Sequence, residues 1–425
     1  MSHPVEPLNR PTLTALQEQR FRALLDIVPR NGFYAAKFRA AGLDTARLTL
    51  ANLPQLPFTT KAELLADQLE HPPYGRVLTY PREDYCRLHQ TSGTSGKPLR
   101  WLDTPASWDA LLGCWETMFR IAGIGRGDRL FFPFSFGPFL GFWTAFHTAS
   151  RLGLLTLPGG GMSSSARLRF LLDHEATVVC CTPTYALRLA EVAAAEGVDL
   201  VGSPVRLVIV AGEPGGSIPA TRSRIEQAWG ARVLDHNGLT EVGPTGIECL
   251  PNPAGLHLLE SDYLVEVIDP QTGAARPPGE AGELVLTNLG RLGSPVIRYR
   301  TGDLVRCSAT PCPCGLPFVR LEGGVLGRTD DMILLRGNNL YPAALEAVIH
   351  RFADVAEYRV EVDQSSALAE LRIEVEPCAG IDPAGLAERV SRAVRDAFWF
   401  RAEVIAVAQG ALPRFDMKAR RIVRK

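Results

Sequence analysis

Apolar and polar residues follow two different periods along this chain. Segments in which apolar residues recur every three or four positions predict helices, and short continuous apolar runs predict buried strands. Residues 11–41 have the helical period throughout, which predicts a helical opening. Strands and helices are then predicted in alternation. The predicted strands are 87–90, 129–134, 154–157, 177–182, 207–211 and 232–235, and the predicted helices are 108–121, 141–152, 166–174, 185–196 and 217–229.

This alternation predicts a sheet with helices on both faces. Several of the predicted strands are apolar at every position, as expected for strands that are buried on both faces of a mostly parallel sheet. Ligands of such sheets bind beyond the carboxyl ends of the strands. We therefore expect four loop-like strand ends to gather at one rim, namely residues 134–137, 182–183, 211–213 and 236–238.

The pattern changes twice in the second half of the chain. Strand patterns at 264–268, 282–286 and 296–305 predict an antiparallel subdomain. A junction at 327–337, with a glycine at each end, leads into a small α/β unit, which ends in a basic tail over 418–425. The predicted fold class is α/β. A large N-terminal domain (1–328) has mostly parallel α/β sheets plus an antiparallel β subdomain, and a small mobile α/β C-terminal domain (329–425) follows.

Composition and charge exclude several classes of function. The chain has 425 residues, of which 46% are hydrophobic, so it can bury a large core. A formal net charge of −1 gives no electrostatic case for a nucleic-acid partner. No apolar run reaches the roughly 18 residues of a membrane span, and the N-terminus lacks the apolar core of a signal peptide. We therefore expect a cytoplasmic protein without a membrane partner.

The stretch TSGTSGKP, residues 91–98, has the composition of a phosphate-binding loop. Its glycines allow the backbone to approach a ligand closely, and its backbone N–H groups, hydroxyls and Lys97 are donors for phosphate oxygens. It is not a Walker A loop, because two residues rather than four separate Gly93 from Gly96. A flexible surface loop is the alternative for the isolated stretch.

Two carboxylates and a lysine could complete a nucleotide site. Glu241 follows a predicted glycine turn and could hold Mg²⁺, which takes one or two carboxylates plus substrate phosphates; the alternative is a helix N-cap with an acidic first turn. Asp303 could accept both hydroxyls of a ribose, or could belong to a plain Thr-Gly-Asp turn. Lys418 could reach a developing negative charge, or could be a solvated charge of the tail.

Three cysteines and a histidine have the residue types of a tetrahedral zinc site: Cys249, His257, Cys312 and Cys314. Their spacing matches no standard zinc pattern, and Cys307 could compete as a ligand. The alternative is a set of reduced thiols beside a hydrogen-bonded histidine. An odd total of nine cysteines favours free thiols or a metal site over disulfides. The others are expected to be small core residues: Cys86, Cys114, Cys180, Cys181 and Cys378.

Taken together and in this order, the motifs resemble those of the adenylate-forming superfamily of acyl-CoA synthetases, adenylation domains and luciferases. Within it the chain is similar to the phenylacetate-CoA ligase family. That similarity is carried by the segment LPFTTK at 56–61, the shortened N-terminal region and the Cys-Pro-Cys-Gly at 312–315. The resemblance runs from about residue 16 to the last residues.

The resemblance implies a role for each motif. The implied ATP and AMP contacts are Thr91, Ser92, Gly93, Thr94, Ser95, Gly96 and Lys97 to the β,γ-phosphates, Ala211, Gly212, Glu213 and Pro214 to the adenine, Thr240 to the α-phosphate, and Asp303 with Arg328 to the ribose. Glu241 would bind Mg²⁺, Asp330 would be the hinge, Gly337 would lie near the thiol channel, and Lys418 would be the catalytic lysine. Relatives also bind zinc through a matching Cys/His/Cys/Cys set.

One departure from the family pattern concerns the residues 236–238. Many relatives have an aromatic residue that stacks on adenine where this chain has Asn237, which precedes Gly238. Two interpretations stay open: His236 compensates, or adenine binds less tightly.

The reaction implied by the resemblance has two halves. A carboxylic acid attacks the α-phosphorus of ATP, giving acyl-AMP and pyrophosphate, and the thiol of coenzyme A displaces AMP after the C-terminal domain turns. Aromatic walls favour a flat aryl acid, although core packing is the alternative for these residues. The predicted acid pocket is Phe136, Gly137, Phe139, Trp143, Thr182, Pro183 and Tyr185. The turn over residues 134–139 differs from that of phenylacetate enzymes, so the acid need not be phenylacetate.

Two other functions fit the same residues. The acyl group could pass to the phosphopantetheinyl thiol of a carrier protein instead of coenzyme A. A catalytically inactive nucleotide-binding regulatory protein could also keep the fold, but the presence of both Glu241 and Lys418 argues against it. The oligomeric state is left open, with a homodimer as one option.

Overall fold

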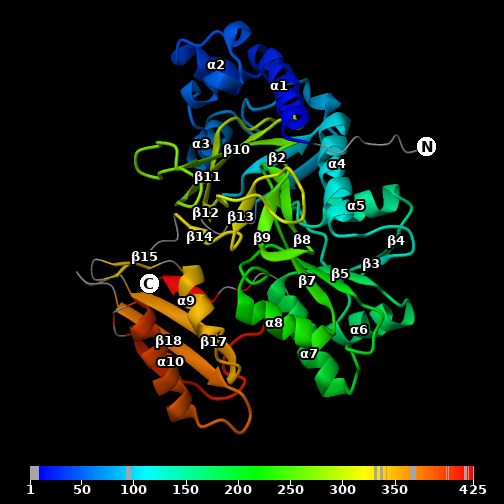
Figure 1. Cartoon of the computed structure of the whole chain (residues 1–425), viewed down its shortest axis with the longest axis vertical. Coiled ribbons are helices and arrows are strands. Elements are labelled where there is room, and N and C mark those ends of the chain that lie inside the picture. Colours follow the sequence, from blue (N-terminus) through cyan, green and yellow to red (C-terminus); the bar gives the residue numbers. More distant parts are fainter. Residues whose placement is uncertain are drawn as a thin grey trace.

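The computed structural model describes residues 9–91, 97–329, 333–335, 338–340, 342–363, 370–398, 400, 402–415, 419 and 421–424. It has a large N-terminal body and a smaller C-terminal unit, drawn in orange and red in Figure 1. The C-terminal unit lies beside helices α7 (Pro183–Glu196) and α8 (Pro219–Trp229) of the body.

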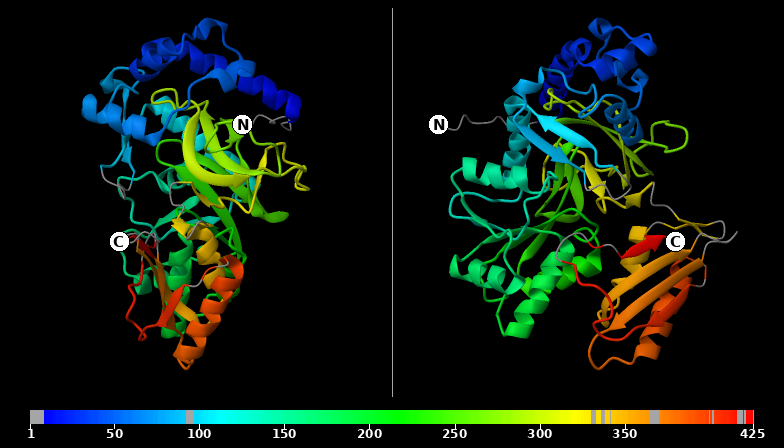
Figure 2. Two further views of the ribbon diagram at one scale, coloured as in Figure 1. Left: turned by 90° about the vertical axis from the view of Figure 1, so that its left-hand side faces the viewer. Right: turned by 180° about the vertical axis from the view of Figure 1, so that it is seen from behind.

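The helical opening predicted over 11–41 is present as α1 (Arg10–Ile27) and α2 (Gly32–Ala40), and a third helix, α3 (Lys61–Glu70), follows. Local sequence sets where they begin. Asn9 caps α1 by accepting the backbone N–H of Thr12, and Thr60 forms a capping box with Glu63 at the start of α3. Figure 2 shows these helices above the antiparallel sheet, at the end of the molecule away from the C-terminal unit.

The centre of the body is a mixed sheet of eight strands within the described residues, in the order β13-β9-β8-β7-β6-β5-β3-β4. The strands β4, β3, β5, β6 and β7 are parallel neighbours. Their bounds are β3 Arg129–Phe132, β4 Leu155–Pro158, β5 Val178–Cys181, β6 Leu207–Val210, β7 Arg232–Leu239, β8 Gly243–Cys249, β9 Asn252–Leu258 and β13 Arg320–Glu322.

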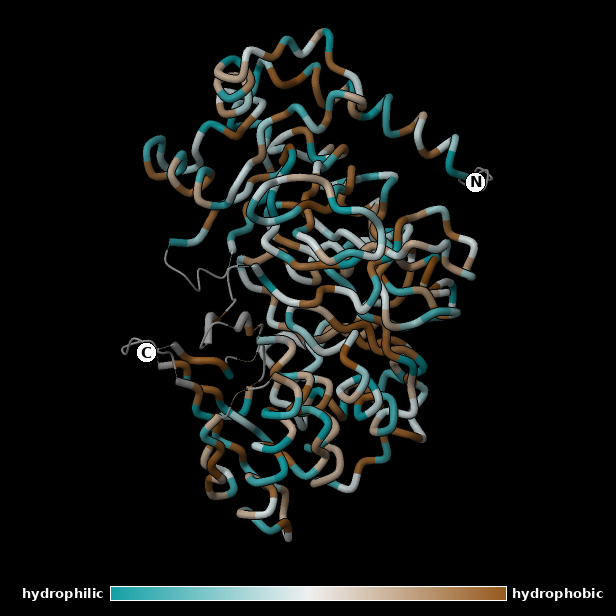
Figure 3. Tube along the Cα trace, turned by 60° about the vertical axis from the view of Figure 1, so that its left-hand side comes forward, coloured by the Kyte–Doolittle hydropathy of each residue, from teal (hydrophilic) through white to brown (hydrophobic). Residues whose placement is uncertain are grey.

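Both faces of the parallel strands are buried, as the apolar runs predict. Along β6, Leu207 and Ile209 face one core cluster while Val208 and Val210 face the other. Helices α4 (Pro105–Ile121) and α5 (Trp143–Arg151) pack on the first face, and α6 (Ser164–Asp173), α7 and α8 pack on the second. Figure 3 shows apolar segments of the chain gathered in the interior of the body, with many polar segments along its outer parts.

Strand β7 differs from the prediction, because it continues through residues 236–238 instead of ending in a loop. These residues pair with the antiparallel strand β8 across a bulge between Asn237 and Gly238. No strand was predicted over β8, whose sequence contains Gly243, Pro244 and Gly246. Gly246 is needed there, because a Cβ atom at this position would lie 2.2 Å from the carbonyl oxygen of His257 in β9.

Two smaller sheets of the body carry further candidate residues. The predicted antiparallel subdomain is present as β10-β11-β12-β14, with bounds β10 Tyr263–Ile268, β11 Ala281–Asn288, β12 Tyr299–Arg306 and β14 Gly327–Arg328. A hairpin of β1 (Arg87–Gln90) and β2 (Arg100–Asp103) flanks the predicted phosphate loop. Within the described residues, no helix is long and apolar enough to cross a bilayer.

The C-terminal unit has an apolar core of its own. Its elements are β15 Ile333–Leu335, β16 Asn338–Leu340, α9 Pro342–Ile349, β17 Val355–Asp363, β18 Glu370–Pro377, α10 Pro383–Phe398, β19 Glu403–Ala406 and β20 Ile422–Arg424. The basic tail is not free, because β20 pairs in parallel with β17. The predicted boundary between 328 and 329 stays a prediction, since residues 330–332 lie outside the described residues.

Candidate active site

The hairpin β1-β2 holds the two ends of the predicted phosphate loop together. The backbone N–H of Thr91 donates to the carbonyl of Leu99 at 2.9 Å, and the N–H of Leu99 donates to Oγ1 of Thr91 at 3.1 Å. Lys97 is exposed at the end of this loop. The N–H of Gln90 also donates to the carbonyl of Pro138, and this bond joins β1 to the turn over residues 134–139. Ser92, Gly93, Thr94, Ser95 and Gly96 lie outside the described residues.

Glu241 lies in the turn between β7 and β8 and is almost fully buried, with 3% of its surface exposed. The hydroxyl of Tyr299 at the start of β12 donates to Oε1 of Glu241 at 2.6 Å. Burial and the neighbouring carboxylate raise the pKa of Tyr299, so its hydroxyl stays protonated and donates. The glycine of this turn with a positive φ is Gly243, at +109°. The predicted glycine turn was centred on Gly238, which has no positive φ.

A buried ion pair fixes the backbone of Thr240. Nε and Nη2 of Arg291 each donate to a carboxylate oxygen of Asp103 at 2.6 Å, and neither side chain is exposed. Nη1 of the same guanidinium donates to the carbonyl oxygen of Thr240 at 2.7 Å. No sequence pattern predicts this contact, because Asp103 and Arg291 are 188 positions apart and belong to no spacing motif.

Asp303 and Arg328 lie opposite each other on β12 and β14. Nη1 of Arg328 donates to Oδ1 of Asp303 at 3.0 Å. Asp303 is 6% exposed and Arg328 is partly exposed. The structure thus brings together the two residues that were predicted to hold the ribose, although their role toward a nucleotide stays a prediction.

Glu213 follows β6 in the segment predicted to contact adenine, which also contains Ala211, Gly212 and Pro214. Gly212 has a φ of +92°, a conformation that favours glycine at this strand end. Both carboxylate oxygens of Glu213 accept backbone N–H groups, Oε1 from Thr184 at 2.8 Å and Oε2 from Ala419 at 2.7 Å.

His236 lies within β7 and packs in the aromatic core. Its ring centroid is 4.5 Å from that of Trp115, and its Nδ1 lies 2.8 Å from the carbonyl oxygen of Gly246. Burial lowers the pKa of His236 to about 4, so the imidazole is neutral at pH 7. Whether His236 or Asn237 contributes to adenine binding stays a prediction.

The residues of the predicted acid pocket do not surround one cavity. Gly137 and Trp143 line a cavity of about 230 Å³ together with Cys86, Arg87, Leu88, His89, Trp108 and His147. Phe136 packs on Trp143, with ring centroids 4.6 Å apart, and Phe139 packs on Phe134 at 5.4 Å. Pro183 instead lines a small cavity between the body and the C-terminal unit.

Tyr185 and Thr182 have structural partners. Tyr185 is 1% exposed in the core under the sheet, where its hydroxyl accepts a hydrogen bond from Nη1 of Arg167 at 2.6 Å. Thr182 caps α7 by accepting the N–H of Tyr185 at 3.1 Å. For Tyr185 the structure therefore favours the core-packing alternative, because a buried tyrosine needs a partner for its hydroxyl and has one here.

The four candidate zinc ligands converge, with their ligand atoms all within 4.8 Å of one another. The Sγ atoms of Cys249 and Cys312 are 3.8 Å apart, and Sγ of Cys314 is 3.3 Å from Nε2 of His257. Tetrahedral zinc with bonds of about 2.3 Å separates two thiolates by about 3.8 Å. Nδ1 of His257 lies 3.3 Å from the carbonyl of Phe318, which suits a ring that ligates through Nε2. Cys307 is not part of this described group.

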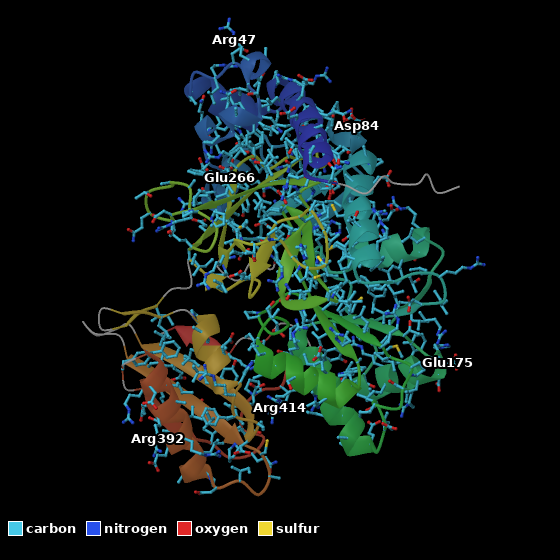
Figure 4. The ribbon with its side chains drawn as sticks, in the orientation of Figure 1. Arg47, Asp84, Glu175, Glu266, Arg392 and Arg414 are labelled. Carbon is cyan, nitrogen blue, oxygen red and sulfur yellow. The ribbon has the colours of Figure 1, made fainter. Side chains whose placement is uncertain are left out.

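Several bonds join the C-terminal unit to the body. Oγ1 of Thr221 on α8 bonds to Nδ1 of His350, and Nη1 of Arg421 donates to Oγ1 of Thr184 at 3.3 Å. Arg414, labelled in Figure 4, lies where the unit faces α7 and α8. Lys418, Asp330 and Gly337 lie outside the described residues, so their predicted roles as catalytic lysine, hinge and thiol-channel residue stay predictions.

Comparison with known proteins decides the family. The model of the AMP-binding enzyme family matches residues 44–290, and that of the AMP-binding enzyme C-terminal domain matches residues 337–425. A phenylacetate-coenzyme A ligase of Thermus thermophilus is 32% identical over 99% of this chain and 98% of its own length. The chain belongs to the AMP-binding enzyme family. Within it, this AMP-binding enzyme is a member of the phenylacetate-CoA ligase family and an acid–thiol ligase.

Crystal structures of a related ligase indicate which arrangement of the two parts this AMP-binding enzyme has. The 2-hydroxyisobutyryl-CoA ligase in its postadenylation state superposes with a TM-score of 0.92, at 29% identity and with 99% of this chain and 91% of that one covered. The same ligase in its thioesterification state, with the same coverage, gives only 0.74. The present arrangement therefore resembles the former state.

Proposed function

We propose that this protein activates an aryl carboxylic acid with ATP, forming acyl-AMP and pyrophosphate, and then transfers the acyl group to the thiol of coenzyme A. The observation that carries the proposal is a continuous set of contacts beneath the candidate nucleotide site. Arg291 joins the hairpin strand β2 to the backbone of Thr240. Tyr299 joins the adjacent Glu241 to β12, the strand that carries Asp303.

In the first half-reaction the acid attacks the α-phosphorus of ATP. The backbone and hydroxyls of the loop after Thr91 would hold the β- and γ-phosphates, Thr240 would bind the α-phosphate, and Asp303 would accept the ribose hydroxyls. Mg²⁺, when held by Glu241, would neutralise charge on the phosphate oxygens. Lys418 would supply a further positive charge as negative charge develops on the transferred group.

The second half-reaction needs a different arrangement of the two parts. The C-terminal unit would turn about Asp330, withdraw Lys418 and admit coenzyme A, whose thiolate displaces AMP. The junction has a glycine at each end and the small polar residues Thr329, Asp330 and Asp331 near its start, which suits such a hinge. The lower similarity to the thioesterification state of the related ligase is consistent with a structure in which this turn has not occurred.

The cavity lined by Gly137 and Trp143 supports an aryl acid. Two indole rings, those of Trp108 and Trp143, form its walls together with His147. Burial lowers the pKa of His147, so it presents a neutral ring beside these indoles. Aromatic walls of this kind favour a flat ring packed edge to face or offset.

Acid-dependent exchange of labelled pyrophosphate into ATP tests this proposal. We expect exchange with a subset of phenylacetate- and benzoate-like acids, and stoichiometric AMP and acyl-CoA once coenzyme A is added. If the acyl group were transferred only to a phosphopantetheinylated carrier protein, the acceptor would be that protein and not coenzyme A. An absence of exchange across the whole set of aryl acids would contradict the proposed substrate class.

Replacing Glu241 with glutamine should lower kcat/KM for Mg-ATP on the order of a hundredfold, because a metal-bound phosphate loses several kcal/mol of charge stabilisation. Initial rates of pyrophosphate exchange over a range of Mg²⁺ concentrations measure the effect. Glu18→Gln, an exposed position on α1, is the matched control and should leave the rates unchanged. Wild-type rates in Glu241→Gln would exclude the metal role.

We also propose that Cys249, His257, Cys312 and Cys314 hold one zinc ion. Purified protein should contain about one equivalent of zinc by elemental analysis. Cys312→Ser should remove most of it and lower the temperature of unfolding, because a structural site couples metal binding to folding. Cys307→Ser should keep the metal, and zinc loss in that variant, or metal-free wild-type protein, would contradict the ligand set.

A further inference from the structure

The segment directly after Lys418 is bonded to the rim of the body by two groups. The backbone N–H of Ala419 donates to Oε2 of Glu213 at 2.7 Å, and Nη1 of Arg421 donates to Oγ1 of Thr184 at 3.3 Å. Both acceptors follow strands of the parallel sheet, Thr184 after β5 and Glu213 after β6. The chain beside Lys418 is therefore attached where ligands of such a sheet are expected.

Glu213 is also bonded to the body. Its other oxygen, Oε1, accepts the N–H of Thr184 at 2.8 Å, in the first turn of α7. Backbone N–H groups in a first helical turn lack partners within the helix, and the helix dipole favours a negative charge there. The carboxylate consequently has one oxygen fixed by its own domain and the other bonded to the C-terminal segment.

Arg421 adds a second, charged attachment. Its Nε and Nη2 donate to the two oxygens of Glu357 on β17 at 2.5 and 3.1 Å, so the guanidinium is oriented by the C-terminal unit. Burial opposes the charge, but the bonds to Glu357 and the nearby carboxylate of Glu213 prevail and raise the pKa of Arg421. A permanent cation therefore faces the rim where Glu213 lies.

We propose that Glu213 is a positioning residue for the adenylation half-reaction, because its carboxylate fixes the backbone next to Lys418 while the C-terminal unit has the present arrangement. The inference rests on the proposed function, since it takes Lys418 as the catalytic lysine. It assigns the side chain of Glu213 to the C-terminal segment rather than to the adenine. When the unit turns for the second half-reaction, this bond breaks and Glu213 no longer contributes.

Measuring the two half-reactions separately tests the role of Glu213. In Glu213→Gln one carboxylate oxygen becomes an NH₂ group that faces an N–H donor, and a charge-assisted bond is lost. We expect pyrophosphate exchange to fall about tenfold or more, while thioester formation from synthetic acyl-adenylate and coenzyme A stays within about twofold of wild type. Equal loss in both half-reactions, or unchanged exchange, would overturn the proposal.

A matched control and a second pair of variants sharpen this test. Glu191→Gln removes a carboxylate from the cavity between the body and the C-terminal unit, which Thr184 and Arg421 also line. Glu191 bonds to Arg188 of its own helix, so this variant should change neither half-reaction. Ala419→Pro removes the N–H donor from the other side, whereas Ala419→Gly keeps it. The double variant Glu213→Gln with Ala419→Pro should lose no more exchange than the worse single variant; an additive loss would contradict a shared bond.

The outcomes also separate this inference from the proposed function. Full exchange in Lys418→Ala would overturn both. Loss of exchange in Lys418→Ala together with full exchange in Glu213→Gln would overturn this inference alone. Should Glu213→Gln fail to fold, the comparison of Ala419→Pro with Ala419→Gly decides the same question.

Discussion

Lys418→Ala is expected to lower the adenylation rate by about a hundred- to a thousandfold, the usual effect of removing a group that stabilises charge only in the transition state. Its neighbours support a location at the nucleotide site, because Ala419 bonds to Glu213 and Arg421 bonds to Thr184. Thioester formation from a supplied acyl-adenylate should stay within about twofold of wild type, since the lysine has by then been withdrawn.

Pyrophosphate exchange and single-turnover thioester formation, measured on the same preparation, give the two rates. Lys37→Ala is a suitable control. Lys37 pairs with Glu63 between helices α2 and α3, at the end of the body away from the C-terminal unit, so this variant should affect neither rate. A loss of similar size in both half-reactions would show that Lys418 supports the fold or both steps, and would contradict its assignment to adenylation.

Arg291→Met is expected to destabilise the body by about 3–5 kcal/mol, the cost of leaving a buried charge without its partner. Asp103 is fully buried and would keep its carboxylate but lose both bonds from the guanidinium. The carbonyl of Thr240 would lose its donor at the same time, so the affinity for ATP should fall as well. Unfolding in urea, followed by tryptophan fluorescence, measures the first effect.

Two comparisons identify the source of that destabilisation. Arg291→Met combined with Asp103→Leu removes both charges and should recover much of the lost stability, because the unpaired charge causes most of the cost. Arg47→Ala breaks an exposed pair with Asp44 and should cost less than about 1 kcal/mol. A small effect of Arg291→Met, similar to that of Arg47→Ala, would contradict a structural role for the buried pair.

The parallel half of the body was predictable because its strands are apolar at every position and its helices are amphipathic. No strand was predicted over β8, because Gly243, Pro244 and Gly246 interrupt the apolar pattern, although all seven residues of the strand are buried. Glycine is required at position 246 because the backbone of β9 leaves no room for a Cβ atom, and no local sequence pattern predicts that neighbour. The sequence predicted a basic tail at the end of the chain and missed strand β20. This strand forms by pairing with β17, which is distant in sequence.

The candidate site was predictable where motifs carry their own chemistry. Asp303 and Arg328 lie together, as do the four zinc candidates, which is the proximity that their predicted roles require, and the binding roles themselves stay predictions. Arg291 and the hydroxyl of Tyr299 were missed, because each acts on a residue that is distant in sequence. Tyr185 was placed in the acid pocket because it is aromatic and follows a strand end, and its hydrogen-bond partner Arg167 lies on a different helix.

The most direct test of the account is a crystal structure with a non-hydrolysable acyl-sulfamoyl adenosine in which the acyl group is an aryl acid. We expect the ribose hydroxyls on Asp303, the sulfamoyl group beside Thr240, and the aryl ring in the cavity lined by Trp143. Lys418 should reach the sulfamoyl oxygens, with Ala419 still bonded to Glu213. A nucleotide bound away from Asp303 and Thr240, or no bound nucleotide at saturating concentration, would contradict the account.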